Sequence, residues 1–380
     1  MLLSVDRYLQ RYEPVIHKSN CDILHAPRLT LDDNSNLAGA RVVNIVQGEC
    51  AHVARRQQCD YLAGDGVTTC HLLCLRSTST NTNGKNDALC SLAHIDRVLA
   101  CSEIERMIYE HVRFHDPASS SSDNANDYAQ RCFSKSKSSS SSNSNNDRAI
   151  MIRMRIHIVG GFNDEGEKSI QITTFLLHAL TNLAQAYAPM IHMTLQTCLV
   201  GCMNTDPNSN GPIGRGLAIH IDTGEVRLCE VDSSVRGPDI PLRSCRIFSL
   251  QAYKLQVIHM PYPMQYIDEK TDNDDNNGES LLSNSCLLCI EPFMFKNFPE
   301  LDAHLSYSDE ELLSHISTSP MCETPSFCSD ARQMLQYLKD HVWWEEFCGG
   351  ILVYQRVGVN GWRRVMSADL SQSIIRAADD

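Results

Sequence analysis

Residues 150–161 read IMIRMRIHIVGG, and this stretch decides which fold class the chain can adopt. Isoleucine or methionine at positions 150, 152, 154, 156 and 158 alternates with Met, Arg, Arg and His at positions 151, 153, 155 and 157. This period of two predicts a half-buried β-strand that ends at Gly160-Gly161. Apolar residues then recur at helical spacing from 170 to 187, and Pro189 should end that helix.

The segments further out add hairpins and more helices. Residues 217–221 and 226–231 flank the turn sequence DTGE, and two short strands should flank Asn360-Gly361. Ser308 followed by Glu311 is a capping-box pattern, and another helix is expected over about 327–339. Because helices and hairpins are mixed without regular βαβ alternation, we predict an α+β fold, a β-sheet sandwich covered by helices, in a single domain over 1–380.

Polar insertions interrupt these patterned segments. Residues 119–146 are dominated by Ser, Asn, Asp and Lys, which cannot bury enough apolar surface to offset the entropy of ordering. We predict a disordered insertion there, inside the domain. Residues 268–279, DEKTDNDDNNGE, are expected to form an acidic loop, and 77–86 and 204–211 resemble shorter loops of the same kind.

Composition excludes several classes of protein. The net charge is −13 and no long run of Lys and Arg occurs, so we expect no nucleic-acid partner. No stretch approaches the roughly 18 consecutive apolar residues of a membrane span, and the N-terminus lacks the apolar core of a signal peptide. The 17 cysteines are odd in number and irregularly spaced, which suits reduced thiols in the cytoplasm.

One of these cysteines occupies a distinctive place. In GDGVTTCHLLCL, residues 64–75, Cys70 lies where a glycine-containing turn meets an apolar segment. Backbone N–H groups and the hydroxyls of Thr68 and Thr69 could surround its sulfur and, later, an oxyanion. Cys70 is therefore a candidate nucleophile. Pattern alone favours a simpler alternative, a buried core cysteine, since free cysteine is among the most buried residue types.

A cysteine nucleophile needs a base, and two histidines are candidates. His71 is adjacent, but in a strand it would point to the face opposite Cys70. His94 ends a second apolar segment, ALCSLAHI, and is followed closely by Asp96. If the two segments pair as neighbouring strands across the 77–86 loop, Cys70 and His94 could meet. The alternative is an ordinary hydrogen-bonded histidine at a strand end.

Metal and cofactor motifs are incomplete. Cys286 and Cys289 have zinc-knuckle spacing, but no second Cys/His pair lies at the matching distance. The pairs Cys70 with Cys74 and Cys198 with Cys202 lack a second pair as well, and the glycine pairs lack the rest of a phosphate-loop motif. We expect neither a metal nor a cofactor.

Five segments, in chain order, resemble the eukaryotic protein N-terminal asparagine amidohydrolase family: GDGVTTCHLLCLR, SLAHID, HIVGGFND, VRGPDIPLR and STSPMCETPSFC. The resemblance implies a hydrolase that removes ammonia from the side chain of an N-terminal asparagine. The product, an N-terminal aspartate, enters the arginylation and ubiquitin-dependent N-degron route. The resemblance also implies a fold like that of bacterial Cys-His protein deamidases.

Site residues follow from the same resemblance. Cys70 would be the nucleophile, and His94 the general base and acid, with a thioester intermediate. Asp65, Thr68 and Thr69 are oxyanion or orienting candidates, Gly160 and Gly161 belong to the surrounding shell, and Glu323, Ser319 and His157 are substrate-binding candidates. Glu323 or Asp65 would bind the α-ammonium. The implied partners are proteins or peptides with a free N-terminal asparagine. We expect the protein to be a monomer, located in the cytoplasm or also in the nucleus.

Two departures from the family pattern keep alternatives open. Gly64 stands where the family places Ser or Thr, so the identity of a third catalytic residue is open. The chain begins Met1-Leu2-Leu3 rather than Met-Pro, and a bulky Leu2 should retain Met1, so a free N-terminal proline is not expected. The alternatives are a protein glutamine deamidase of the same fold and a catalytically silent protein that binds N-terminal asparagine.

Overall fold

The fold was analysed in a computed structural model of the 380-residue chain. The structure describes residues 16–33, 37, 39–55, 57–79, 87–116, 151–188, 190–259, 286–295, 298–341 and 351–365. The predicted insertion at 119–146 and the predicted acidic loop at 268–279 lie outside these residues.

A six-stranded sheet forms the centre of the molecule. Its strands follow the order β11 (Gln256–His259), β3 (Glu49–Ala54), β6 (Ala88–Ile95), β5 (His71–Ser79), β7 (Ile152–Gly160) and β8 (Ile191–Leu199). The four central strands, β3, β6, β5 and β7, are antiparallel neighbours, whereas β11 pairs with β3 and β8 with β7 in parallel. The strands containing the Cys70 and His94 segments are therefore adjacent, as predicted.

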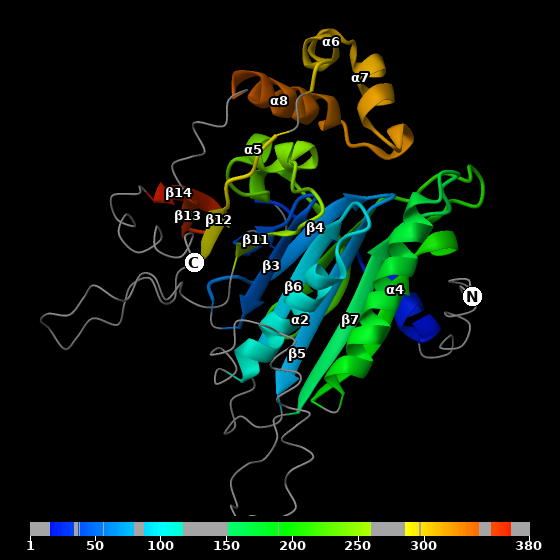
Figure 1. The fold of residues 1–380 in the computed structure, drawn as a ribbon, viewed down its shortest axis with the longest axis vertical. Coiled ribbons are helices and arrows are strands. Elements are labelled where there is room, and N and C mark those ends of the chain that lie inside the picture. The colour runs from blue at the N-terminus through cyan, green and yellow to red at the C-terminus, as the bar shows by residue number, and fades with distance from the viewer. Residues whose placement is uncertain are drawn as a thin grey trace, which may run out of the picture.

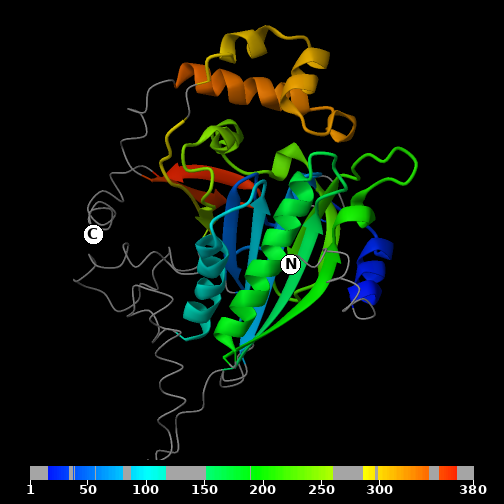
Figure 2. The ribbon, with the colours of Figure 1, turned by 45° about the vertical axis from the view of Figure 1, so that its right-hand side comes forward.

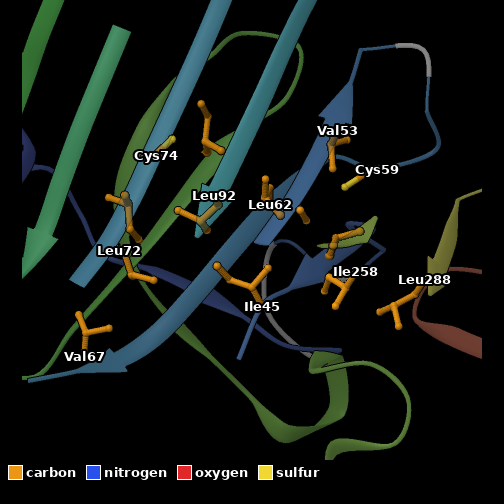
Figure 3. Packing of buried hydrophobic residues seen from close by; sticks show 14 of the residues in the cluster. Ile45, Val53, Cys59, Leu62, Val67, Leu72, Cys74, Leu92, Ile258 and Leu288 are labelled. Carbon is orange, nitrogen blue, oxygen red and sulfur yellow. The ribbon is translucent and has the colours of Figure 1, made fainter. Parts of the chain in front are cut away.

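A second sheet packs against the first. It contains β1 (Leu29–Leu31), β10 (Val226–Val231), β9 (Arg215–His220), β4 (Tyr61–Val67) and β2 (Val42–Asn44). Leu62 of β4 faces Leu72 of β5 and Leu92 of β6 within one buried cluster (Figure 3). A third, small sheet holds β12 (Leu287–Ile290), β13 (Leu352–Val357) and β14 (Gly361–Val365). The two large sheets thus enclose an apolar core typical of a sandwich.

Two long helices cover the other face of the six-stranded sheet. Figures 1 and 2 show α2 (Cys101–His115) and α4 (Lys168–Tyr187) side by side over this face. Apolar residues of both helices pack against Leu73 and Leu75 of β5 in a second buried cluster. Alternate residues of β5 therefore serve two cores, because successive strand side chains point to opposite faces. Leu72 and Cys74 enter the sandwich, while Leu73 and Leu75 meet the helices.

Shorter helices gather beyond one end of the six-stranded sheet (Figure 1). They are α5 (Ile240–Ser244), α6 (Leu301–Ser306), α7 (Asp309–Ile316) and α8 (Phe327–Asp340), with the 3₁₀ turns η2 (Gly201–Asn204), η3 (Ser233–Val235), η4 (Cys245–Phe248) and η5 (Pro320–Cys322). Leu312, Met334 and Leu335 join the same apolar cluster as the sandwich core. The helices α7 and α8 therefore pack against the sheets through one shared apolar cluster.

Most of the predicted elements are confirmed. The strand ending at Gly160, the hairpin of β9 and β10, the capping box at Ser308 and the hairpin of β13 and β14 all form. The helix expected from 170 begins two residues earlier, at Lys168. Two expectations are corrected. β7, α4 and β8 make a βαβ unit with a parallel strand pair, and residues 77–79 of the loop expected over 77–86 belong to strand β5. Within the described ranges, no helix has both the length and the apolar composition needed to cross a membrane.

Candidate active site

Cys70 lies immediately before β5, in the connection from β4 of one sheet to β5 of the other. Its side chain is half-buried against the sandwich core. The Cys70 carbonyl accepts a hydrogen bond of 2.9 Å from the Gly161 amide. Gly160 has a φ of +121°, and a Cβ there would lie 2.2 Å from the same carbonyl oxygen. The glycine pair that ends β7 is thus needed for the close approach to the Cys70 backbone.

His94 shares a face of the sheet with Cys70. In the antiparallel register His94 stands directly opposite Leu72, which points into the sandwich. Cys70 precedes Leu72 by two residues, so it lies diagonally across from His94, a relation that separates Cβ atoms by about 7 Å. An imidazole ring spans much of that distance. The register therefore puts Cys70 and His94 on the same face, at the same end of the sheet.

His71 points the other way, also as predicted. Its Nε2 lies 2.7 Å from the Thr173 hydroxyl of α4, on the helix-covered face. Burial lowers the pKa of His71 to about 3. A Cβ on Gly161 would lie 2.4 Å from the His71 ring, so this glycine also makes room for the imidazole. His71 fixes the start of β5 against α4 and is not the partner of the thiol.

The resting pair of Cys70 and His94 is neutral at pH 7. Burial, followed by the charge of Asp96, raises the pKa of the Cys70 thiol to about 12. Burial lowers the pKa of His94 to about 4, while Asp96 opposes that shift. The His94 side chain is 7% exposed, and its Nδ1 has no hydrogen-bond partner among the described residues. A neutral imidazole is the form that can accept a thiol proton.

Asp96 is the residue whose importance sequence reasoning missed. It follows β6 directly, its side chain is 6% exposed, and it accepts hydrogen bonds from Arg97 and from Gln47 at 2.9 Å. These hydrogen bonds and the Arg97 charge outweigh burial and hold the pKa of Asp96 below its ordinary value. Its charge acts on both Cys70 and His94. The spacing HxD was a signal in the sequence, since residues two apart at a strand end share a face.

Thr69 joins the thiol to a distant part of the chain. A hydrogen bond from its side chain lowers the pKa of Cys70, opposing the effect of burial. The Thr69 hydroxyl also lies 3.4 Å from that of Thr318, and the Thr69 carbonyl accepts from Ser169 Oγ of α4 at 3.4 Å. Thr68 is half-buried in the same turn. Helix α4 and the segment after α7 therefore meet at Thr69, the residue before Cys70.

The segment reached through Thr318 carries Ser319 and Glu323. Ser319 is 4% exposed, and its hydroxyl has no partner among the described residues. The half-buried Glu323 carboxylate accepts a hydrogen bond from Ser317, and burial raises the pKa of Glu323. Buried polar groups in proteins nearly always have partners, so the unpartnered Ser319 hydroxyl, next in sequence to Thr318, is a candidate group for binding a ligand.

Two sequence candidates lie elsewhere. His157 pairs with Cys74 rather than with the start of β5, and its Nδ1 lies 3.0 Å from the Thr197 hydroxyl. Asp65 accepts a hydrogen bond of 2.8 Å from the Val231 amide of β10. The resemblance gave His157 as a candidate, and the strand register sets it opposite Cys74, four residues beyond Cys70. Neither residue is brought to the thiol by these contacts.

Gly64 has no room for the missing hydroxyl. A Cβ at this position would lie 2.9 Å from Leu72 Cδ2 and 3.1 Å from Ile45 Cγ1. Both side chains belong to the sandwich core, where Figure 3 shows them as neighbours. The space that a serine or threonine would enter is therefore filled by hydrocarbon next to the cross-strand partner of His94.

A second cysteine–histidine pair is excluded as a catalytic site by burial. Cys50 Sγ lies 3.7 Å from His52 Nε2 on the helix-covered face, and both residues are fully buried. Burial raises the pKa of Cys50 to about 12 and lowers that of His52 to about 3. Cys286 and Cys289 are buried as well, and no group of three or more His, Cys, Asp or Glu in the described parts of the chain is arranged to hold a metal.

Comparison with known proteins identifies the family of the chain. A family model described as protein N-terminal asparagine amidohydrolase matches residues 33–125, 122–266 and 281–364. Proteins with that name from Sus scrofa and Homo sapiens are each 27% identical to the chain over 282 residues, 74% of this chain and 68% of the relative. The Mus musculus protein is 27% identical over 280 residues. The chain belongs to the protein N-terminal asparagine amidohydrolase family.

Proposed function

We propose that this protein hydrolyses the side-chain amide of an asparagine at the N-terminus of a protein or peptide, giving aspartate and ammonia. The observation that carries the proposal is the placement of a half-buried thiol and a neutral imidazole on one face, at one end of the central sheet. The names of the relatives point to the same substrate. The chemistry would follow that of Cys-His deamidases.

In the first half-reaction, His94 accepts the Cys70 proton as the sulfur attacks the carboxamide carbon. The carbonyl electron pair moves to oxygen, and the oxyanion is stabilised by N–H groups of the turn and by the Thr68 or Thr69 hydroxyl. The oxyanion then collapses, the C–N bond breaks, and the imidazolium gives its proton to the departing nitrogen. Ammonia leaves, and a thioester remains on Cys70. Since the resting thiol has a high pKa, proton transfer and attack should occur together.

In the second half-reaction, His94 removes a proton from a water molecule that attacks the thioester carbon. The new tetrahedral intermediate expels the Cys70 sulfur, which recovers its proton from the imidazolium. The buried charge of Asp96 favours each imidazolium state of His94, because it raises the pKa of that imidazole. We assign Asp96 this supporting role where a hydroxyl at position 64 is absent.

Recognition of the N-terminus requires a carboxylate for the α-ammonium. We assign this role to Glu323, because Thr318 of its segment is hydrogen-bonded to Thr69, the residue before Cys70. The Asp65 carboxylate, by contrast, accepts a hydrogen bond from the β10 backbone. The unpartnered Ser319 hydroxyl would donate to the first peptide carbonyl of the substrate. An acetylated asparagine, which lacks the cation, should be rejected.

The product would be a protein with N-terminal aspartate. We propose that it feeds arginylation and the N-degron route of ubiquitin-dependent degradation, with the protein acting as a monomer in the cytoplasm, and also in the nucleus. The proposed pathway, oligomeric state and location all depend on the proposed reaction.

A peptide panel tests the substrate assignment. Peptides of one sequence beginning with Asn, Gln or acetyl-Asn are incubated with the protein and scored for ammonia and for conversion of amide to acid by mass. We expect turnover of the first peptide alone, or at least a strong preference for it, because one methylene in a pocket gives a factor of about 10–200. Preference for glutamine, turnover of acetyl-Asn, or binding without ammonia release would overturn the proposal.

A further inference from the structure

Met321 is far more exposed than the other large apolar side chains on the described surface. Its exposed fraction is 95%, whereas the others, such as Val98, Leu250 and Met151, are at or near one half. Side chains that are half covered still pack against the protein. Met321 packs against almost nothing, so a role in holding the fold together does not explain it.

The backbone that carries Met321 is held firmly. Met321 sits in the 3₁₀ turn η5, where Pro320 restricts φ and the Cys322 amide donates to the Ser319 carbonyl at 2.9 Å. The Cys322 thiol donates to the Pro212 carbonyl at 2.9 Å. The turn thus presents a flexible, fully exposed thioether from a fixed base.

This turn lies beside the candidate active site. Thr318, three residues before Met321, meets Thr69, the neighbour of Cys70. Glu323, two residues after Met321, is the carboxylate assigned to the α-ammonium. In an N-terminal asparagine the carboxamide and the ammonium branch from adjacent carbons, so a substrate bound to Cys70 and Glu323 must lie along this segment. Its chain then continues through the first carbonyl to the second residue.

We propose that Met321 contacts the side chain of the second residue of the substrate and favours large apolar side chains at that position. The inference rests on the proposed function, since it places the substrate by its contacts with Cys70 and Glu323. An unbranched thioether adapts to differently shaped partners, which suits a site that meets many protein N-termini. The contact forms with the bound substrate before the reaction and persists through it.

Steady-state kinetics of Met321→Gln on two peptides test this role. The peptides begin Asn-Leu and Asn-Gly and are otherwise identical. We expect the variant to raise KM for Asn-Leu by about fivefold, because it loses a small area of apolar contact with the leucine side chain. The value of kcat should be unchanged. KM for Asn-Gly should stay within about twofold of the wild-type value, because glycine offers no side chain to contact. Met321→Leu should keep the preference for Asn-Leu.

Met151→Gln is the matched control. Met151 is 46% exposed and lies before β7 at the end of the strand opposite Gly160, about 30 Å from the thiol along the strand. The Met151→Gln substitution should leave the KM values for Asn-Leu and Asn-Gly unchanged. An equal loss on both peptides in Met321→Gln, or no change on either, would overturn the assignment of Met321 alone. Failure of the wild-type protein to release ammonia from either peptide would overturn the proposed function and this inference with it.

Discussion

Leu72 of β5 and His94 of β6 are direct cross-strand partners, and Gly64 of the facing sheet has its Cα against Leu72. This relationship places the imidazole on the sandwich side of the sheet, at the end where β5 follows Cys70. It also means that a hydroxyl at position 64 has no room, because Leu72, the cross-strand partner of His94, occupies that space.

The pH dependence of turnover should report the buried His94. Its lowered pKa, about 4, means that the neutral base is fully present above pH 5 and is lost as the pH falls through 4. We expect kcat, which reports the enzyme with substrate bound, to hold between pH 5 and 7 and to fall only near pH 4. On the alkaline side kcat/KM should decline near pH 8, where the substrate α-ammonium loses its proton.

The measurement is a pH–rate profile on an Asn peptide, with samples exposed to each pH and then assayed at pH 7 to exclude unfolding. An acid limb near pH 6.5, the ordinary histidine value, would contradict the burial assigned to His94.

Gly64→Ser should weaken the protein rather than supply a missing catalytic group. The new side chain must displace Leu72 and Ile45, and such overpacking costs about 1–3 kcal/mol. Displacement of Leu72 should also shift His94 and lower kcat by about tenfold. Urea denaturation and steady-state kinetics measure the two effects.

Gly214→Ser is the control for stability, because a Cβ there meets nothing within 4 Å. Unchanged stability with increased kcat in Gly64→Ser would show that the hydroxyl fits and assists the base, contrary to this account.

Glu323→Gln should impair binding of the N-terminus. The substitution keeps the shape of the side chain and removes the charge that would pair with the α-ammonium, so KM for an Asn peptide should rise by about tenfold or more. Glu310→Gln, an exposed position on α7, is the matched control. Equal KM values for the two variants would assign ammonium recognition to another group.

The buried ion pair of Arg243 and Glu49 should be a major determinant of stability. Both side chains are fully buried, and the guanidinium donates to the two carboxylate oxygens at 2.9 and 2.7 Å. Glu49→Gln leaves the buried cation without its counter-charge, which should lower the free energy of unfolding by about 3–5 kcal/mol. Chemical denaturation measures this loss.

Glu230→Gln provides the comparison, since Glu230 pairs with Arg28 on the surface and should contribute less than about 1 kcal/mol. Similar losses in the two variants would contradict the importance given to burial.

Local patterns predicted the elements well, but contacts between distant segments could not be predicted from them. The alternation over 150–158 and the capping box at Ser308 depend on neighbouring residues, and both are confirmed. The alternation fixed the strand of His157 but not its register, which sets it opposite Cys74. The meeting of Thr69 with Thr318 joins residues 249 apart, which no periodicity encodes. The resemblance pointed to the segment of Thr318, and the structure joins it to Thr69, the residue before Cys70.

The most direct test of the central claim is the rate of ammonia release from an Asn peptide by four proteins: wild type, Cys70→Ala, His94→Ala and Cys202→Ala. Cys202 is an exposed thiol in η2 and serves as the control for losing a cysteine. We predict full activity in Cys202→Ala and losses of at least about 1,000-fold in Cys70→Ala and His94→Ala, each with the fold retained by circular dichroism. Wild-type activity in a folded Cys70→Ala protein would contradict the account.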